Sequence, residues 1–235
     1  MYKELWASLI FICAVVWIAV LLKYLSENKK YKKSSYGKQS TNNFWKVISN
    51  QGMRGEYRTS LVVEAAPFEK KMIFNCYIPN RSGDKTEIDM IMLCRQGVYV
   101  IENKNYSGWI FGDEKSKNWC EILKGKKYFF YNPVKQNKSH INNLERLLQI
   151  GMEKYISLIT FNGNANLKKV TVESENVYVT GYKHLKKFLK EQTNKPGILT
   201  DEQIESIYQR LLSGTELSDI EKQEHVDRIK KQFKK

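Results

Sequence analysis

The chain has 235 residues and a net charge of +14, which leaves room for one domain of ordinary size plus appendages. Its four cysteines are scattered and do not cluster with the three histidines, which excludes a disulfide framework and a zinc site. The charge alone is a weak sign of nucleic-acid binding, because residues 23–50 hold +6 of it and the tail, residues 222–235, holds +4. The sequence also contains no glycine-rich phosphate loop and no serine or cysteine catalytic triad.

An apolar segment lies close to the N-terminus. Leu5 to Leu22 contains no charged residue, and Ser8 is its one clearly polar side chain. Eighteen helical residues span roughly 27 Å, close to the thickness of a bilayer core. A cleaved signal peptide is the competing interpretation, but its apolar core is normally shorter and no cleavage site follows. We therefore expect residues 1–25 to form an uncleaved transmembrane anchor.

Positive charge follows this segment. The net charge of +6 in residues 23–50 predicts an N-terminus outside the cell membrane and a cytoplasmic C-terminal domain, because positively charged flanks stay in the cytoplasm. Residues 26–43 are polar, basic and poor in large aliphatic residues, so we expect a flexible linker. Its lysines could also contact anionic lipid headgroups.

A folded domain is expected over residues 44–213. Its expected elements are a helix at 51–66, a strand at 71–78, central strands at 86–94 and 98–104, a hairpin at 119–123 and 128–131, a helix at 134–148, strands at 155–161 and 176–180, and helices at 182–191 and 201–212. Residues 105–118 contain two glycines and are expected to form a loop. The tail, 214–235, is expected to be a basic amphipathic helix.

Three charged residues stand out in the two central strands, which otherwise are mostly apolar. Glu102 and Lys104 are two residues apart on one strand and therefore share a face. A hairpin turned at Gly97 would place Asp89 beside them. The carboxylates could hold a hard divalent cation, and the lysine could orient a water or steady a phosphate. The alternative is a purely structural charge pair at the end of a strand.

A second group of charges follows the central strands. Seven lysines lie between residues 115 and 138, with Trp119, Tyr128, Phe129, Phe130 and Tyr131 interleaved; they are Lys115, Lys117, Lys124, Lys126, Lys127, Lys135 and Lys138. This pattern is typical of a groove that binds a nucleic-acid backbone and stacks bases. It is equally typical of an amphipathic hairpin with its lysines in solvent.

Several motifs occur in one order along the chain. They are Gly52-x-x-Gly55-Glu56, then Glu87-Ile88-Asp89, then Gly97 to Gly108 with Glu102-Asn103-Lys104 inside it, and then Asn132-Pro133-x-x-Gln136-Asn137. From about residue 52 to 148 the chain resembles the nuclease-related domain, NERD, of the PD-(D/E)xK nuclease superfamily. Isoleucine in place of proline before Asp89 is one departure; it removes a turn constraint and keeps the ligand.

The resemblance implies an α/β (α+β) fold, a restriction-endonuclease-like mixed sheet flanked by helices. It implies that Asp89 and Glu102 bind metal and that Lys104 is catalytic. Glu56 then corresponds to the acidic residue of the first helix, and Gln136 to the polar residue of the following helix. The expected activity is hydrolysis of phosphodiester bonds of DNA, or of RNA, with Mg²⁺ or Mn²⁺ at the membrane. The alternatives are a catalytically silent nucleic-acid-binding module and a tethered protein-interaction module.

Overall fold

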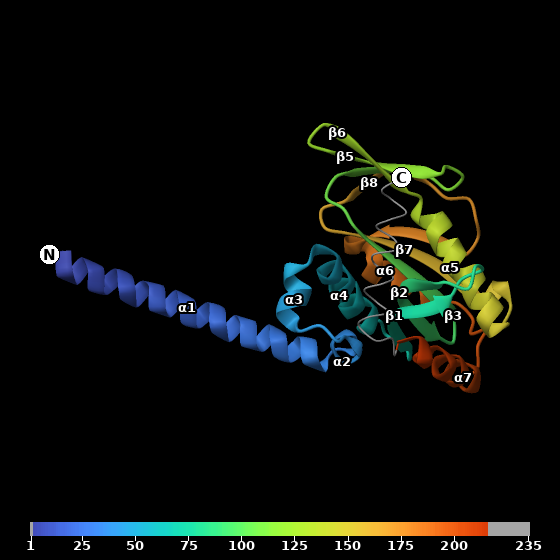
Figure 1. Cartoon of the computed structure of the whole chain (residues 1–235), viewed down its shortest axis with the longest axis horizontal. Helices are drawn as coiled ribbons and strands as arrows, with labels where there is room; N and C mark the ends of the chain where they lie inside the picture. The colour runs from blue at the N-terminus through green and yellow to red at the C-terminus, as the bar shows by residue number, and fades with distance from the viewer. Residues whose placement is uncertain (1, 216–235) are drawn as a thin grey trace.

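The computed structural model describes residues 2–215, and in it two β-sheets are flanked by helices (Figure 1). The helices are α1 Tyr2–Lys33, α2 Ser35–Gln39, α3 Phe44–Ser49, α4 Gln51–Glu64, α5 Pro133–Leu148, α6 Tyr182–Gln192 and α7 Asp201–Leu212. The strands are β1 Lys71–Pro79, β2 Lys85–Cys94, β3 Gly97–Asn105, β4 Trp109–Asp113, β5 Asn118–Leu123, β6 Lys126–Tyr131, β7 Tyr155–Asn162, β8 Asn166–Thr171 and β9 Val177–Gly181. The expected mixed sheet flanked by helices is confirmed.

The central sheet has the strand order β1-β2-β3-β7-β9. The first three strands pair antiparallel, whereas β3, β7 and β9 run parallel to one another. One face packs against α1 to α4 and α6, and the other packs against α5 and α7. Because both faces are covered, the central strands contain nearly continuous apolar runs instead of an alternating pattern.

The second sheet has the order β6-β5-β4-β8 and packs one face onto β7 and the start of α5. Two of its strands correct the expectations. Residues 109–113 were expected in a loop but form β4, and residues 166–171 form β8, which was not expected. The glycines indicated a loop, yet a Cβ at Gly112 would lie only 2.2 Å from the ring of Trp119. Gly112 therefore makes room for this indole.

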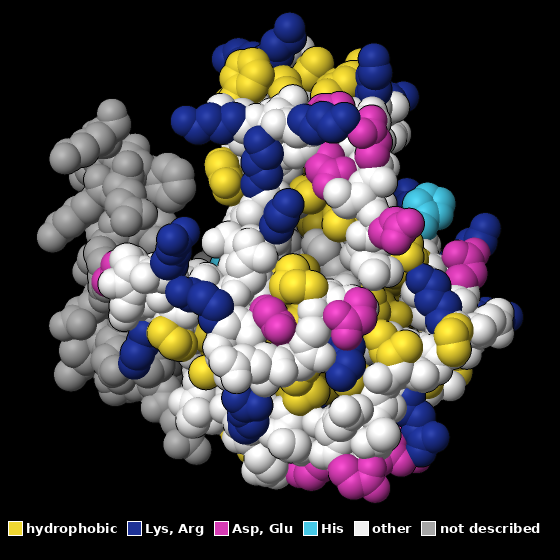
Figure 2. Space-filling model, turned by 90° about the vertical axis from the view of Figure 1, so that its right-hand side faces the viewer, with side chains coloured by type: hydrophobic (Ala, Val, Ile, Leu, Met, Phe, Trp, Pro, Cys, Tyr) yellow, Lys and Arg dark blue, Asp and Glu magenta, His cyan; other side chains and the backbone are white. Residues whose placement is uncertain are grey.

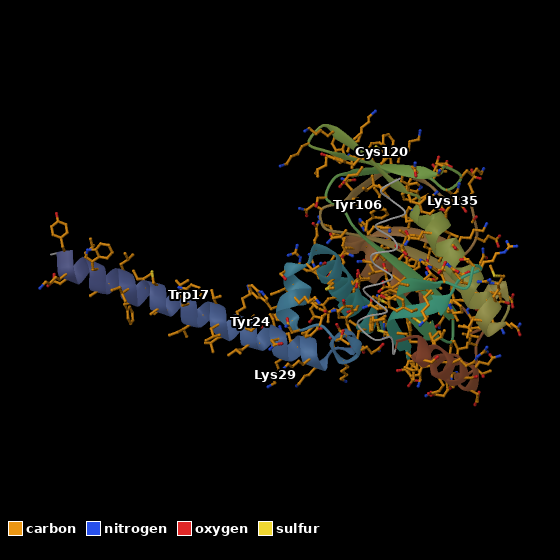
Figure 3. All side chains as sticks on the ribbon, in the orientation of Figure 1. Trp17, Tyr24, Lys29, Tyr106, Cys120 and Lys135 are labelled. Atoms are coloured by element: carbon orange, nitrogen blue, oxygen red, sulfur yellow. The ribbon has the colours of Figure 1, made fainter. Side chains whose placement is uncertain are left out.

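The N-terminal helix α1 is continuous over 32 residues. It is long and apolar enough to cross a membrane, and the share of its apolar window buried against the protein is 0%. A signal sequence would satisfy the same criteria. Figure 3 shows Trp17 on the free part of the helix and Tyr24 close to the point where it meets the domain. There the ring of Tyr24 lies 5.6 Å from that of Phe44.

The expectation of a flexible linker at residues 26–43 was wrong. Helix α1 continues to Lys33, and α2 follows almost at once. Tyr31 and Tyr36 are 3% and 1% exposed, and the side-chain amide of Gln39 donates to Met72 O of β1 at 2.8 Å. These few residues anchor a segment whose overall composition is polar. The tail helix expected at 214–235 lies, from residue 216 on, outside the described residues.

Candidate active site

A local irregularity in the central sheet determines where Asp89 points. The β1–β2 register passes from Phe74↔Met90 to Cys76↔Ile88, and Asn75 between them has φ of 49°. Ile88 packs on the α5 side of the sheet, whereas Met90, two residues later, packs on the α4 side. The regular alternation of the strand is thus broken at Asp89. Such breaks re-aim side chains and are common beside active sites.

The carboxylate of Asp89 lies against the end of β3. Its Oδ2 accepts a hydrogen bond from the backbone N–H of Asn103 at 2.9 Å, next to Glu102. The hairpin therefore brings Asp89 to Glu102 and Lys104 as the sequence predicted. The three groups come from adjacent strands of one buried sheet, so their relative positions are fixed by backbone pairing.

Lys104 joins β3 to α5. Its Nζ lies 2.8 Å from Glu102 Oε1 and donates to Gln136 Oε1 at 3.0 Å. The prediction that Glu102 and Lys104 share a face is confirmed. The other carboxylate oxygen of Glu102 lies 3.5 Å from Nε2 of His140, one turn after Gln136 on α5. His140 is a site residue that the motifs do not reveal, although its spacing of four residues from Gln136 places it on the same face of the helix.

Burial and neighbouring charges give the carboxyl groups of Asp89 and Glu102 different pKa values. Desolvation raises the pKa of Asp89 well above its usual value, and the charge of Glu102 adds to the increase. Burial also raises the pKa of Glu102, but Lys104 and His140 outweigh it and the net pKa is lowered. Burial lowers the pKa of Lys104, yet Glu102 raises it further, so the ammonium stays charged. Glu102 has a cationic partner, and Asp89 is the carboxyl group with the larger cost of ionisation.

Glu56 reaches the site from α4. Desolvation and the charge of Glu87 raise its pKa to about 7, and a hydrogen bond from Tyr36 acts in the opposite direction. The Tyr36 hydroxyl donates this bond to Glu56 Oε2 over 3.1 Å. Tyr36 was missed because it lies in the segment that was expected to be a linker. The chain offers no sequence signal for it beyond an aromatic residue among lysines.

Asn103 fixes the end of β3 to its neighbours. Its Oδ1 accepts hydrogen bonds from Thr59 of α4 and Thr160 of β7, each at 2.9 Å, and from the amide of Asn162. A Cβ at Gly55 would lie 3.1 Å from Nδ2 of Asn103, so glycine allows α4 to approach this strand closely. Gly55 thus lets α4, which carries Glu56, lie close to β3.

The carboxyl groups of Asp89 and Glu102 suit a cation that the protein encloses only in part. Within residues 2–215 no group of three or more His, Cys, Asp and Glu side chains is arranged to hold a metal ion. Asp89 and Glu102 supply two carboxylates, and Mg²⁺ in proteins is usually bound by one or two carboxylates, with waters and substrate phosphates completing the octahedron. Burial and the charges of Glu102 and Glu56 raise the pKa of Asp89, and a cation bound between Asp89 and Glu102 would lower it again. These residues fit a magnesium-like ion shared with a phosphate.

The seven lysines of residues 115–138 fall into two groups. One group contains Lys117, which precedes β5, and the other contains Lys124, which follows it. The length of this strand, roughly 20 Å, therefore separates the two groups. One group is Lys115, Lys117, Lys135 and Lys138. Within it Lys115 pairs with Glu173 at 2.7 Å, and Lys135 donates to the carbonyl of Lys115 at 2.6 Å; Figure 3 labels Lys135 on α5. The other group, Lys124, Lys126 and Lys127, surrounds the β5–β6 turn.

Comparison with known proteins identifies the family of the chain. Residues 51–162 match the sequence family described as the nuclease-related domain, and this range contains Glu56, Asp89, Glu102, Lys104 and Gln136. An uncharacterized protein of Bacillus anthracis is 31% identical over 227 residues, which cover 96% of this chain and 99% of that relative. No solved structure matches the chain.

Proposed function

Because this chain belongs to the nuclease-related domain family, we propose that it is a membrane-anchored nuclease that hydrolyses phosphodiester bonds of DNA, or of RNA, with a divalent cation. One observation carries the proposal. Lys104 Nζ is held at 2.8 Å from Glu102 and 3.0 Å from Gln136, beside the buried carboxyl group of Asp89. A lysine paired with one carboxylate, near a second carboxyl group and fixed by a neutral amide, is suited to phosphoryl chemistry.

Each residue has a distinct task in this proposal. Asp89 and Glu102 would hold Mg²⁺ or Mn²⁺, which when bound supplies Lewis acidity and lowers the pKa of a coordinated water. Lys104 stays protonated and can orient the attacking water or offset charge that develops on the phosphorus oxygens. Gln136 fixes the lysine through Oε1, and its amide N–H groups remain able to donate to a phosphate oxygen. Glu56, with a pKa of about 7, is suited to exchange a proton near neutral pH.

We further propose that α1 is the membrane anchor, with the N-terminus outside and the nuclease-related domain in the cytoplasm. The positive charge of residues 23–50 supports this orientation. The domain itself would begin near Tyr31 and not at residue 44, because the tyrosines of this segment are buried in the domain. Lysines of residues 23–50 would contact lipid headgroups, and lysines of both groups in 115–138 would contact nucleic-acid phosphates. Lys115 and Lys135 would exchange their contacts with Glu173 and with the carbonyl of Lys115 for such phosphates.

The decisive test uses the full-length protein in detergent. It is incubated with plasmid, single-stranded DNA and RNA, in Mg²⁺, Mn²⁺ or EDTA. Lys104→Ala should lower turnover by a factor on the order of 10²–10⁴ and leave binding nearly unchanged, because the ammonium acts mainly in the transition state. Lys187→Ala, at a side chain 81% exposed on α6, is the matched control and should cleave normally. Unchanged cleavage by Lys104→Ala would contradict this mechanism. Metal-independent binding of nucleic acid without cleavage would favour a catalytically silent nucleic-acid-binding module.

A further inference from the structure

The four-stranded sheet has an outer face that carries exposed aromatic side chains. The strand register aligns Phe111, Cys120 and Phe129 in one row across β4, β5 and β6. Side chains two residues apart share a face, so Trp109 and Tyr131 belong to the same side. The opposite side, with Ile110 and Trp119, packs into the core. We use the name aromatic face for the outer residues Trp109, Phe111, Cys120, Ile122, Phe129 and Tyr131.

This aromatic face is open to solvent. Phe129 is 72% exposed, Trp109 is 53% exposed and Tyr131 is 45% exposed. Figure 2 shows hydrophobic side chains bordered by lysine and arginine at the top of the molecule, the end that the four-stranded sheet occupies in Figure 1. Large aromatic side chains are rarely left in water as a group unless they bind something.

Positive charge surrounds the aromatic face. Lys127 lies opposite Ile122 in the register and projects on the same side, and Lys126 and Lys124 flank the turn beside it. From β8, Lys168 places its Nζ 5.0 Å from the ring centroid of Trp109. Glu121 of β5 points to the inner side, where its carboxylate accepts the backbone N–H groups of Ser107 and Gly108. The acidic residue of β5 is thus turned away from the face.

We infer that the aromatic face binds single-stranded nucleic acid, with bases stacked on Phe129, Trp109 and Tyr131 and phosphates on the surrounding lysines. Exposed π-faces interleaved with cations complement a strand whose bases are free and whose backbone is anionic. A duplex would satisfy only the lysines, because its bases are already stacked on one another. The inference rests on the proposed nuclease function and names its substrate class as a single strand, held outside the catalytic residues.

A lipid surface is the competing occupant, and the position of α1 argues against it. In Figure 1 the four-stranded sheet lies at the top of the domain, whereas α1 joins the domain at its lower left. Trp45, an exposed aromatic residue, lies close to the anchor, because its ring is 6.3 Å from that of Tyr24, just beyond the apolar segment. The domain therefore has another aromatic contact for the headgroups close to its anchor.

The test measures binding by the full-length protein in neutral detergent with EDTA, so that cleavage does not interfere. The probes are fluorescent oligothymidylate, an RNA single strand and a duplex of the same length. Phe129→Ala and Trp109→Ala should each weaken binding of the single strands by roughly 5- to 150-fold, the range that corresponds to loss of one stacked base. Binding of the duplex should change little. Trp45→Ala is the matched control, since it removes an exposed aromatic residue elsewhere, and it should bind normally.

Charge is tested separately from stacking. Replacing Lys126 and Lys127 together by Gln should reduce the slope of log affinity against log salt by roughly 1.4, about 0.7 for each lost phosphate contact on a single strand. The same pair of replacements at Lys186 and Lys187 of α6 should leave the slope unchanged. Unfolding curves identical to wild type verify that these surface variants fold.

Hydrogen exchange of residues 126–131 distinguishes the possible occupants. The oligonucleotide should slow exchange there in detergent and in proteoliposomes, whereas liposomes containing phosphatidylglycerol alone should not. Protection by lipid alone would assign the face to the bilayer. A loss of dimers on Phe129→Ala, seen by light scattering, would assign it to a second copy of the chain, and unaltered single-strand binding by both aromatic variants would also overturn the inference. Because binding is measured in EDTA, loss of binding tests the aromatic face alone; binding without any metal-dependent cleavage would refute the nuclease proposal, and the bound strand would then be a ligand and not a substrate.

Discussion

The hydroxyl group of Tyr36 donates a hydrogen bond to Glu56 Oε2 over 3.1 Å and joins the segment after α1 to the candidate active site. Burial, and then the negative charge of Glu56, raises the pKa of Tyr36 far above its usual value, so the hydroxyl remains a donor. The bond favours the ionised form of Glu56 and opposes the effect of burial on its pKa. Tyr36 thus positions Glu56 and tunes its proton affinity.

Tyr36→Phe should raise the pKa of Glu56 and move the acidic limb of the pH–rate profile to higher pH. It should also destabilise the protein by about 1 kcal/mol, the usual net value of one hydrogen bond. Tyr31→Phe is the matched control, because it removes a hydroxyl that donates to Asn42 O at 2.6 Å in the same aromatic cluster. The control should lose similar stability while its profile stays in place. Equal displacement of the profile in both variants would contradict the role of the Tyr36 bond.

Titration of Glu56 should make the free energy of unfolding depend on pH. Its pKa is about 7 in the folded protein against 4.5 for an ordinary glutamate. Between these values the folded state binds more protons than the unfolded state, so the metal-free protein should lose stability as pH rises from 4.5 to 7. A tenfold difference in proton affinity between the two states corresponds to about 1.4 kcal/mol. Urea unfolding of Glu56→Gln over this range should be flatter than that of wild type; parallel curves would contradict the assignment.

Asp89→Asn tests the cation site without a substrate. The substitution removes one charge from a repelling pair and keeps an acceptor for the N–H of Asn103, so the metal-free variant should melt at or above the wild-type temperature. Wild type should gain stability with Mn²⁺ or Mg²⁺, roughly 2.7 kcal/mol at a hundredfold excess over Kd, and the variant should lose most of this gain.

The control for this experiment is Asp201→Asn, at an exposed carboxylate paired with Arg95. It should respond to metal like wild type. A structural Asp89 predicts the reverse pattern: its loss would destabilise the domain with or without metal, and the melting temperature of wild type would not depend on metal. Thermal unfolding in EDTA and in Mn²⁺ decides between the two.

The orientation of the anchor can be checked by cysteine labelling in intact cells. In a Cys120→Ser background, a cysteine at Lys29 should resist a membrane-impermeant maleimide until the cells are lysed, because positively charged flanks stay inside. A cysteine at Lys3 should be labelled at once. The native Cys76 and Cys94 are buried, and Cys13 lies within the apolar segment. Labelling at residue 29 but not at residue 3 in intact cells would reverse the topology.

The two central strands could be predicted because their apolar runs are long, and the hairpin between them fixed the meeting of Asp89 with Glu102. Other features depend on contacts between distant parts of the chain. Strand β4 follows a glycine and contains another, and it is stabilised by pairing with β5 and β8. Burial of Tyr31 and Tyr36 depends on α3, α4 and β1, whose positions no local pattern among lysines reveals. The irregularity at Asn75 is likewise a property of two paired strands.

The unbroken course of α1 into the domain has a geometric consequence for a protein held in a bilayer. The helix continues for 11 residues beyond Leu22, about 16 Å, before α2 packs on the domain. Because Tyr24 and Tyr31 of α1 both pack against Phe44 of α3, rotation of the domain about its attachment is restricted. Asp89 and Lys104 would therefore stay close to the lipid surface, in one orientation toward it. The protein would then diffuse laterally in the membrane, and it would meet only nucleic acid that lies close to the lipid surface.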